Sequence, residues 1–224
     1  MDIGIKPAKI LLPKDCDMTA WACIACDQFT SESAFWEELQ KFTCGKPTTL
    51  DLILPEIYLS DNADERIARI NRNISDYEKN GIFTELPEGF ILTVRSTPFV
   101  KRRIGLIGAL DLTKYDFSKK SDALIRATEG TIEERIPPRL KIRKDADMEF
   151  PHVMVLYDDE KKEIAEYFYE HRGEYKKLYD FDLNMGGGHV EGYFIGDVDL
   201  VLEKFSRLLD GDRLTAKYGR EDRF

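Results

Sequence analysis

The sequence has no long apolar run, and none of its hydrophobic stretches approaches the roughly 18 residues that a membrane-spanning helix needs. Its N-terminus, MDIGIKPAKILLPKD, is broken by lysine and proline and therefore lacks the continuous hydrophobic core of a signal peptide. We expect a cytoplasmic protein that does not insert into a membrane.

Positive charge is also in deficit. The chain has 33 lysines and arginines against 42 aspartates and glutamates, which gives a formal net charge of -9. A general nucleic-acid binder needs clustered cations to neutralise phosphates, so we expect no nucleic-acid partner. A local basic pocket remains compatible with this charge balance.

Cysteine is scarce, with four residues at positions 16, 23, 26 and 44. Without a secretory signal, reduced thiols are favoured over disulfides. A redox C-x-x-C pair opens a helix, and a zinc site needs a second ligand pair at matching spacing. Cys23 and Cys26 close an apolar run and have no second pair nearby, so the sequence favours structural thiols and predicts no metal site.

The composition is that of a globular protein. The 224 residues are 42% hydrophobic and 33% charged, and 15 glycines and 9 prolines imply no long disordered tract. We expect one α+β domain over residues 1–224, with a possible subdomain border near 144–148. Because no closing element follows the last expected helix, we also expect this chain to be a truncated, N-terminal part of a longer protein.

Alternation and β-branched runs predict strands in the chain. The expected strands are Ala8–Leu12, Trp21–Ala25, Leu50–Leu54, Phe90–Arg95, Ile104–Leu112 and Val153–Tyr157. The fourth and fifth flank a turn-rich segment, which indicates an antiparallel pair, and Gly105 and Gly108 indicate a bulge or a close backbone approach. The fold class that follows is a mixed, partly antiparallel sheet with flanking helices.

Helical periodicity appears in three places, and Lys161–His171 is a weaker candidate. The predicted apolar stripes are Phe35, Leu39 and Phe42; Ile67, Ile70, Ile74 and Tyr77; and Val198, Val201, Leu202, Phe205 and Leu209. Gly45 and Gly81 are placed to end the first two helices, and Asn62 with Glu65 predicts a capping box at the start of the second.

The segment Ile125–Arg143 has a positive charge that the rest of the chain lacks. Its basic residues Arg126, Arg135, Arg139, Lys141 and Arg143 outnumber Glu129, Glu133 and Glu134, for a local net charge of +2. Thr128 and Thr131 flank Gly130, and Pro137-Pro138 follow. Guanidinium and hydroxyl groups beside a glycine are what a phosphate or carboxylate site needs. The alternative is a solvated loop whose arginines pair with its own glutamates.

The segment Cys26–Ser31 places polar side chains between an apolar run and a helix, where α/β proteins often bind ligands. Asp27 is a candidate base or metal ligand, and Gln28 and Thr30 are candidate ligand contacts. Turn and helix-cap roles explain the same residues equally well.

Three consecutive glycines, Gly186, Gly187 and Gly188, precede His189. Their amides can form an anion cradle, to which His189 would donate a hydrogen bond or a proton. The segment is neither a Walker loop nor a dinucleotide fingerprint. A tight hairpin between Leu178–Leu183 and Val190–Ile195 is the favoured interpretation.

Several blocks together resemble a known family. They are PAKILLPK, ACDQFTS, AFWEEL, LILPEIYL, RRIGLIGALDL, ALIRATEGTIEERIPPRLKIR, FPHVMVLYDD and LYDFDLNMGGGHVEGYFI. Their order and spacing, from Pro7 to Phe224, are similar to domain-of-unknown-function family 1015, a group of bacterial and archaeal proteins. The resemblance implies a longer chain with an aspartate-glycine-x-histidine motif, similar to that of nucleotide-using ParB, sulfiredoxin and free-serine-kinase proteins. It also implies that the ACDQFTS, RATEGTIEERIPPR and GGGH blocks converge on one pocket.

The leading hypothesis is therefore a small-molecule enzyme that transfers a phosphoryl group from a nucleotide, with Mg²⁺, and binds an anionic small molecule. Arg126, Arg135 and Arg139 would hold phosphates. Glu129 or Asp27 would act as general base or hold Mg²⁺, and His189 with the three glycines would complete the cradle. The alternatives are a non-catalytic sensor of an anionic metabolite, which needs no base, and a thiol enzyme using Cys26. The sequence leaves the oligomeric state open.

Overall fold

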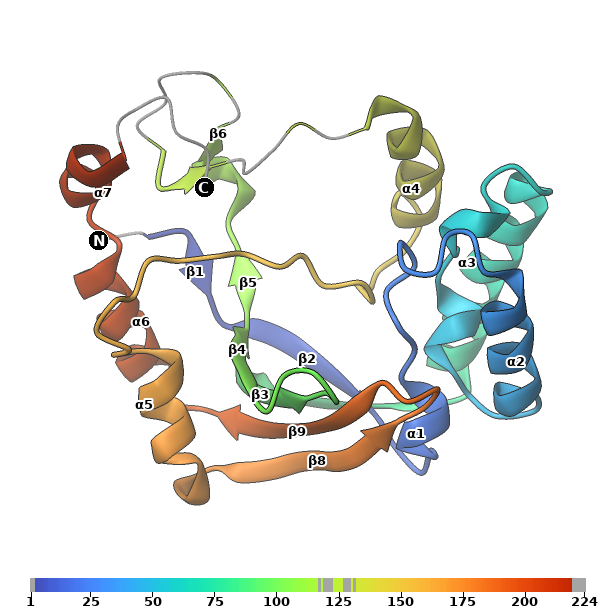
Figure 1. Cartoon of the computed structure of the whole chain (residues 1–224), viewed down its shortest axis with the longest axis horizontal. Coiled ribbons are helices and arrows are strands. Elements are labelled where there is room, and N and C mark those ends of the chain that lie inside the picture. The colour runs from blue at the N-terminus through green and yellow to red at the C-terminus, as the bar shows by residue number, and fades with distance from the viewer. Residues whose placement is uncertain (1–2, 117, 119–122, 127–129, 131, 219–224) are drawn as a thin grey trace.

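A computed structural model shows an α+β protein, as the sequence predicts (Figure 1). The structure describes residues 3–116, 118, 123–126, 130 and 132–218. The strands are β1 (Ile5–Lys6), β2 (Ala8–Pro13), β3 (Phe83–Ser96), β4 (Arg103–Ile107), β5 (Ala109–Leu110), β6 (Tyr115–Asp116), β7 (Ile125–Arg126), β8 (Lys176–Leu183) and β9 (Gly188–Ile195). The helices are α1 (Met18–Trp21), α2 (Ser33–Thr43), α3 (Ala63–Lys79), α4 (Ile136–Arg143), α5 (Ala165–Glu170), α6 (Val198–Leu208) and α7 (Gly211–Tyr218). Short 3₁₀ helices span Thr49–Leu52, Glu56–Tyr58, Leu112–Lys114, Glu133–Arg135 and Arg172–Glu174.

The long strand β3 organises the main sheet. The strand order is β2-β3-β9-β8, and β4 also pairs with β3; all of these pairings are antiparallel. The short pair β1–β5 is antiparallel and β6–β7 is parallel, so the sheet structure is mixed. β3 is central because Phe90–Val94 is an unbroken run of apolar and β-branched residues, which suits a strand with neighbours on both edges.

The predicted antiparallel pair is confirmed in β3 and β4, where Ile91 lies opposite Ile107 and Arg95 lies opposite Arg103. The close approach predicted from the glycines is confirmed at Gly108. A Cβ atom there would lie 2.6 Å from the ring of Phe90, so only glycine fits between β4 and β5.

Alternation along β3 separates the two faces of the sheet. Phe90 and Leu92 point to the face that packs against α5 and α6, whereas Ile91, Thr93 and Arg95 point to the other face. The core on the first face is made by Ile3, Phe90, Leu92, Ile164, Phe168, Tyr193, Ile195, Val201 and Phe205. In Figure 1, α5, α6 and α7 lie at one end of the molecule, and α2, α3 and α4 lie at the other.

The helical end has its own core. Ile67, Ile70 and Ile74 of α3 are buried against Trp21, and each such burial contributes roughly 1.5–3 kcal/mol. Around α2, Trp36 and Leu39 are buried together with Leu50.

Three expected strands are wrong. Trp21 is instead the last residue of α1, and residues 22–25 form no strand. The helix forms because Asp17 accepts hydrogen bonds from the backbone amides of Thr19 and Ala20 and so caps it. Leu50–Leu54 overlaps a 3₁₀ helix, whose amide at Leu50 is capped by Thr48. Val153–Tyr157 pairs with no strand in the described part of the chain.

The three predicted helices are confirmed as α2, α3 and α6, and the weaker candidate as α5. Two details differ. The side chain of Phe42 is 41% exposed, because α2 is turned so that Trp36 and Leu39 face inward. Asn62 has a φ of +50° and makes no side-chain cap bond, so the predicted capping box is absent at this described helix start.

Candidate functional site

Two arginines of the basic segment converge on one buried carboxylate. Arg135 and Arg139 are four residues apart at the start of α4, so they lie on one side of it. Arg135 Nη2 lies 3.0 Å from Glu56 Oε2, and Arg139 Nη2 donates to Glu56 Oε1 at 2.7 Å. The side chain of Glu56 is only 6% exposed, whereas those of Arg135 and Arg139 are 41% and 47% exposed. We call these three residues the arginine clamp.

The local sequence explains why the clamp forms. Pro137 and Pro138 occupy the first positions of α4, where a missing N–H costs nothing and the fixed φ favours helix. The helix therefore begins directly after Arg135. The other side of the clamp, Glu56, opens a 3₁₀ helix, and its backbone N–H donates to Cys26 O at 2.8 Å.

That hydrogen bond joins the clamp to the turn that follows Cys26. Burial raises the pKa of the Cys26 thiol, the charge of Arg139 lowers it, and the charges of Asp27 and Glu56 raise it further. The pKa of this thiol is thus affected by charged groups from two predicted blocks, Asp27 of ACDQFTS and Arg139 of the basic segment. The structure brings these two blocks together.

The exposed turn carries Asp27, Gln28 and Thr30. The backbone N–H of Gln28 donates a hydrogen bond to Ala25 O at 3.0 Å, which closes the turn. α2 begins after Glu32 without a side-chain cap bond, so Thr30 is not the cap of that helix. The side chains of Asp27, Gln28 and Thr30 are therefore exposed to solvent.

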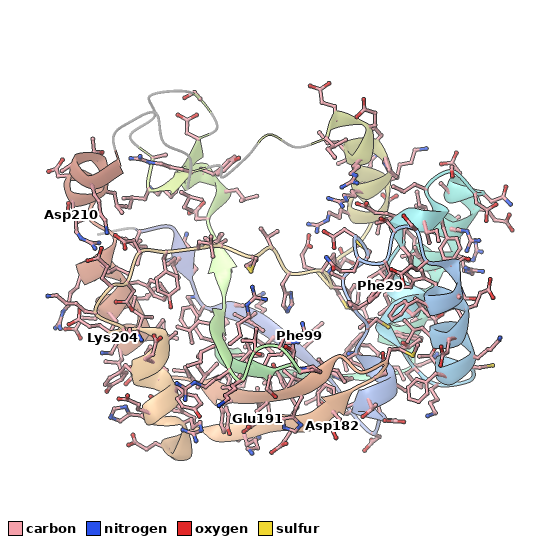
Figure 2. The ribbon with its side chains drawn as sticks, viewed as in Figure 1. Phe29, Phe99, Asp182, Glu191, Lys204 and Asp210 are labelled. Carbon is pink, nitrogen blue, oxygen red and sulfur yellow. The ribbon has the colours of Figure 1, made fainter. Side chains whose placement is uncertain are left out.

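Phe29 gives this turn an aromatic surface. Its ring stacks on that of Phe35, with centroids 4.0 Å apart and planes 11° from parallel. Its φ of +50° is rare for a bulky residue, and strained backbone of this kind clusters at functional sites. The indole N–H of Trp36 donates to Phe29 O at 3.1 Å and holds the conformation. Figure 2 labels Phe29 beside the loop that leads into α2, and the residue is 36% exposed.

Arg126 lies elsewhere. It belongs to β7 and donates to Ala123 O at 3.0 Å and to Thr215 Oγ1 of α7 at 3.4 Å. β7 pairs with β6, and Figure 1 shows β6 well separated from α4, near whose start the other two arginines lie. The other three predicted contacts of this segment, Thr128, Glu129 and Thr131, lie outside the described residues.

The glycine run forms the turn between β8 and β9, as the favoured interpretation predicts. Gly186 and Gly188 have φ values of +72° and +93°, and the Gly187 amide donates to Asn184 O at 2.9 Å within the turn. A Cβ atom on Gly188 would lie 1.9 Å from Ser96 O, so the turn fits closely against the end of β3. These glycines therefore serve the backbone of the hairpin.

His189 stands at the start of β9 between two aspartates of β8. Its Nδ1 lies 2.8 Å from Asp182 Oδ1 and its Nε2 lies 3.0 Å from Asp180 Oδ1. The hydrogen bond to Asp182 and the nearby negative charges raise the pKa of His189. In the described part of the chain, no hydrogen bond or ion pair links His189 to the arginine clamp.

A family model described as "Protein of unknown function (DUF1015)" matches residues 5–216. The chain belongs to this family. No curated protein and no solved structure matches it. Membership confirms the resemblance to family 1015 alone, and it assigns no reaction.

Other chemistries find less support in the geometry. Burial raises the pKa of both Cys23 and Cys26, which disfavours the reactive thiolate form of each. Within the described ranges, no group of three histidine, cysteine or acidic side chains is arranged to hold a metal ion. Among the described helices, none has the length and apolar character needed to cross a bilayer.

Sequence reasoning missed two residues of this site. Glu56 lies in LILPEIYL, 83 residues from Arg139, and nothing local marks it as the partner of two arginines. Phe29 lies inside the ACDQFTS block, but an aromatic residue in a turn carries no signal until its backbone conformation and stacking partner are known.

Proposed function

We propose that this protein binds a nucleotide at the arginine clamp and the adjoining Cys26–Phe29 turn, and transfers its terminal phosphoryl group to a small molecule. The observation that carries the proposal is the clamp itself, in which a buried carboxylate orients two half-exposed arginines beside the turn. The clamp has a net formal charge of +1, so it attracts anions.

The arginines retain donors for a phosphate. A guanidinium has five N–H donors in a planar fork, and Glu56 engages one terminal nitrogen of Arg135 and one of Arg139. Their other N–H groups are available to phosphate oxygens in bidentate geometry. Holding both forks on Glu56 also reduces the side-chain entropy lost on binding.

Phe29 supports a nucleotide over a simple phosphate. It is three residues from Cys26, so its Cα lies within about 11 Å of the Cα of Cys26 at the clamp. Every nucleobase has a π-face, and stacking on an exposed aromatic ring contributes about 1–3 kcal/mol per base. The Phe29 ring, already stacked on Phe35, is positioned for such a contact.

Asp27 is the carboxylate for the chemical step. It lies beside the clamp on the exposed turn, where it would accept the proton of the attacking hydroxyl or share Mg²⁺ with the nucleotide phosphates. The bound Mg²⁺ would neutralise charge that develops on the transferred group. Glu129, the other predicted base, lies outside the described residues, and the proposal requires neither Arg126 nor His189.

Binding is tested by calorimetry with ATP and Mg²⁺. Arg139→Gln should weaken ATP binding at least tenfold, because a charge-assisted hydrogen bond contributes about 1.5–3 kcal/mol. Arg143→Gln is the matched control: it lies on the same helix, and its arginine pairs with Glu149 instead. Phe29→Leu should weaken ATP binding and leave inorganic triphosphate binding unchanged. Equal ATP affinity in all of these proteins would refute the site.

Turnover separates the enzyme from a sensor that uses the same arginines. With ATP and Mg²⁺, wild-type protein should release ADP slowly by transfer to water, and Asp27→Asn should bind ATP but release none. If wild-type protein binds ATP and releases no ADP under any Mg²⁺ concentration, the phosphoryl-transfer proposal fails and the sensor role replaces it.

A further inference from the structure

Two arginines lie opposite each other on adjacent strands of the main sheet. Arg95 of β3 and Arg103 of β4 are direct cross-strand partners, so both side chains leave the same face of the sheet. Directly opposite residues have Cβ atoms only about 4.5–5.5 Å apart, and like charges at this spacing are destabilising. This face is opposite to the one that packs against α5 and α6.

Neither arginine is neutralised in the described part of the chain. Arg95 Nη2 donates to Gly187 O at 3.0 Å, and its buried Nε has no hydrogen-bond partner. Arg103 Nη2 approaches Met154 Sδ at 3.6 Å, and a thioether is a weak acceptor. No carboxylate pairs with either guanidinium among the described residues. The pair therefore holds two positive charges and a buried N–H donor without compensation.

An unsatisfied buried donor destabilises a fold, and the cost is larger when the donor belongs to a charged group. In this fold the unpaired Nε–H of Arg95 lies beside a second positive charge, that of Arg103, which repels it. Such an arrangement is expected where a bound ligand supplies the missing acceptor. A dianion balances both charges, and a tetrahedral oxyanion has enough oxygens to accept from both forks. We propose that Arg95 and Arg103 form a second anion seat, which binds a dianionic phosphate group.

The surroundings leave room for this ligand. Arg103 is exposed, and Arg95 is half-buried and fixed by the hairpin turn. Gly105, next to Arg103 on the same face of β4, has no side chain to fill the space, and a Cβ there would meet only Thr93 at 3.6 Å. Met154 belongs to the unpaired segment that Figure 1 shows crossing the molecule between α4 and α5, so this segment reaches the rim of the seat.

The experiment follows the arginine Nε–H signals by ¹H–¹⁵N NMR at about pH 8, where a phosphate group carries close to two negative charges. Arg95→Lys identifies the Arg95 signal by removing it. Inorganic phosphate should shift that signal in a saturable manner, and acetate at the same ionic strength should not. An equal response to acetate would overturn the assignment of a dianion seat.

Matched variants locate the seat. Arg103→Gln should weaken the phosphate response of Arg95 at least tenfold, as expected for a lost charge-assisted contact. Arg102→Gln removes the same charge one residue away, on a side chain that lies over the ring of Tyr169 at 4.3 Å, and should leave the response within twofold. Equal losses in both variants would refute the seat in favour of general electrostatics.

The proposals of the anion seat and of the nucleotide site at the arginine clamp can be refuted independently of each other. Arg139→Gln should leave the phosphate response of Arg95 intact, because it acts on Glu56 at the other site. If Arg95 never responds while ATP binding depends on Arg139, the seat is wrong and the proposed function stands. If Arg95 responds and ATP does not bind, the reverse holds.

Discussion

Replacing Glu56 by glutamine should destabilise the protein and, at the same time, make its stability more sensitive to phosphate. Glutamine keeps the size of the side chain and removes the charge that holds Arg135 and Arg139 together. In the variant, two guanidinium groups that converge on one point repel each other, and an oxyanion from solution becomes the best substitute for the lost carboxylate.

The magnitude follows from burial. Removing one partner of a fully buried ion pair costs about 3–5 kcal/mol, and an exposed pair contributes about 0–1 kcal/mol. Here the carboxylate is 6% exposed, but the arginines are 41% and 47% exposed and regain hydration when released. We therefore expect a loss of about 2 kcal/mol, which corresponds to a fall in Tm of roughly 4–8 °C for a chain of this size.

The assay is thermal unfolding in chloride buffer, repeated with inorganic phosphate at constant ionic strength. Glu149→Gln is the control, because Glu149 pairs with Arg143 of the same helix while 60% exposed, and its loss should lower Tm by about 4 °C at most. Phosphate should raise the Tm of Glu56→Gln more than that of wild type. If the two variants unfold at the same temperature, or phosphate gives no extra recovery, the clamp is not organised by Glu56.

Two further predictions concern the hairpin. Gly188→Ala should cost more than about 3 kcal/mol in urea unfolding, because its Cβ would lie 1.9 Å from Ser96 O at a φ of +93°, whereas Gly186→Ala, in open space, should cost only about 1–2 kcal/mol; equal losses would contradict the packing. The raised pKa of His189 means that its bond to Asp182 stabilises the fold fully below the unfolded pKa of about 6.5 and is lost as pH rises through the folded pKa. The Tm advantage of wild type over His189→Asn should therefore shrink with rising pH above this range, and a constant difference would exclude the titration.

Side-chain periodicity predicted the elements whose stability comes from one buried face. The isoleucines of α3 and the apolar run in β3 are examples, because burial and backbone geometry demand the same spacing. The pattern failed where local hydrogen bonds override it. Asp17 and Thr48 cap short helices in segments whose apolar residues equally suit strands. Val153–Tyr157 shows a further limit, since a strand-like pattern forms a strand only when a partner edge is available.

For the candidate site, composition pointed to the segment Ile125–Arg143 and not to its geometry. The density of arginines marked Arg135 and Arg139 as anion contacts, but their shared carboxylate comes from a distant segment that a single sequence cannot connect. Arg95 and Arg103 were invisible for a related reason: each is an ordinary strand residue until the register places them opposite each other. The turn-rich segment predicted that these two strands pair, but it did not predict the register, which decides which residues lie opposite each other.

The position of β3 between β4 and β9 has a consequence for biosynthesis. One edge of β3 can pair with β4 once residue 107 has left the ribosome, but the other edge waits for β9, which ends at residue 195. At 5–20 residues per second this interval lasts roughly 4 to 18 seconds. During that time the apolar strand Phe90–Val94 has one unpaired edge and lacks the cover of α6. The nascent chain therefore exposes an aggregation-prone strand edge midway through synthesis, and expression yield should depend on how quickly the β8–β9 hairpin is synthesised.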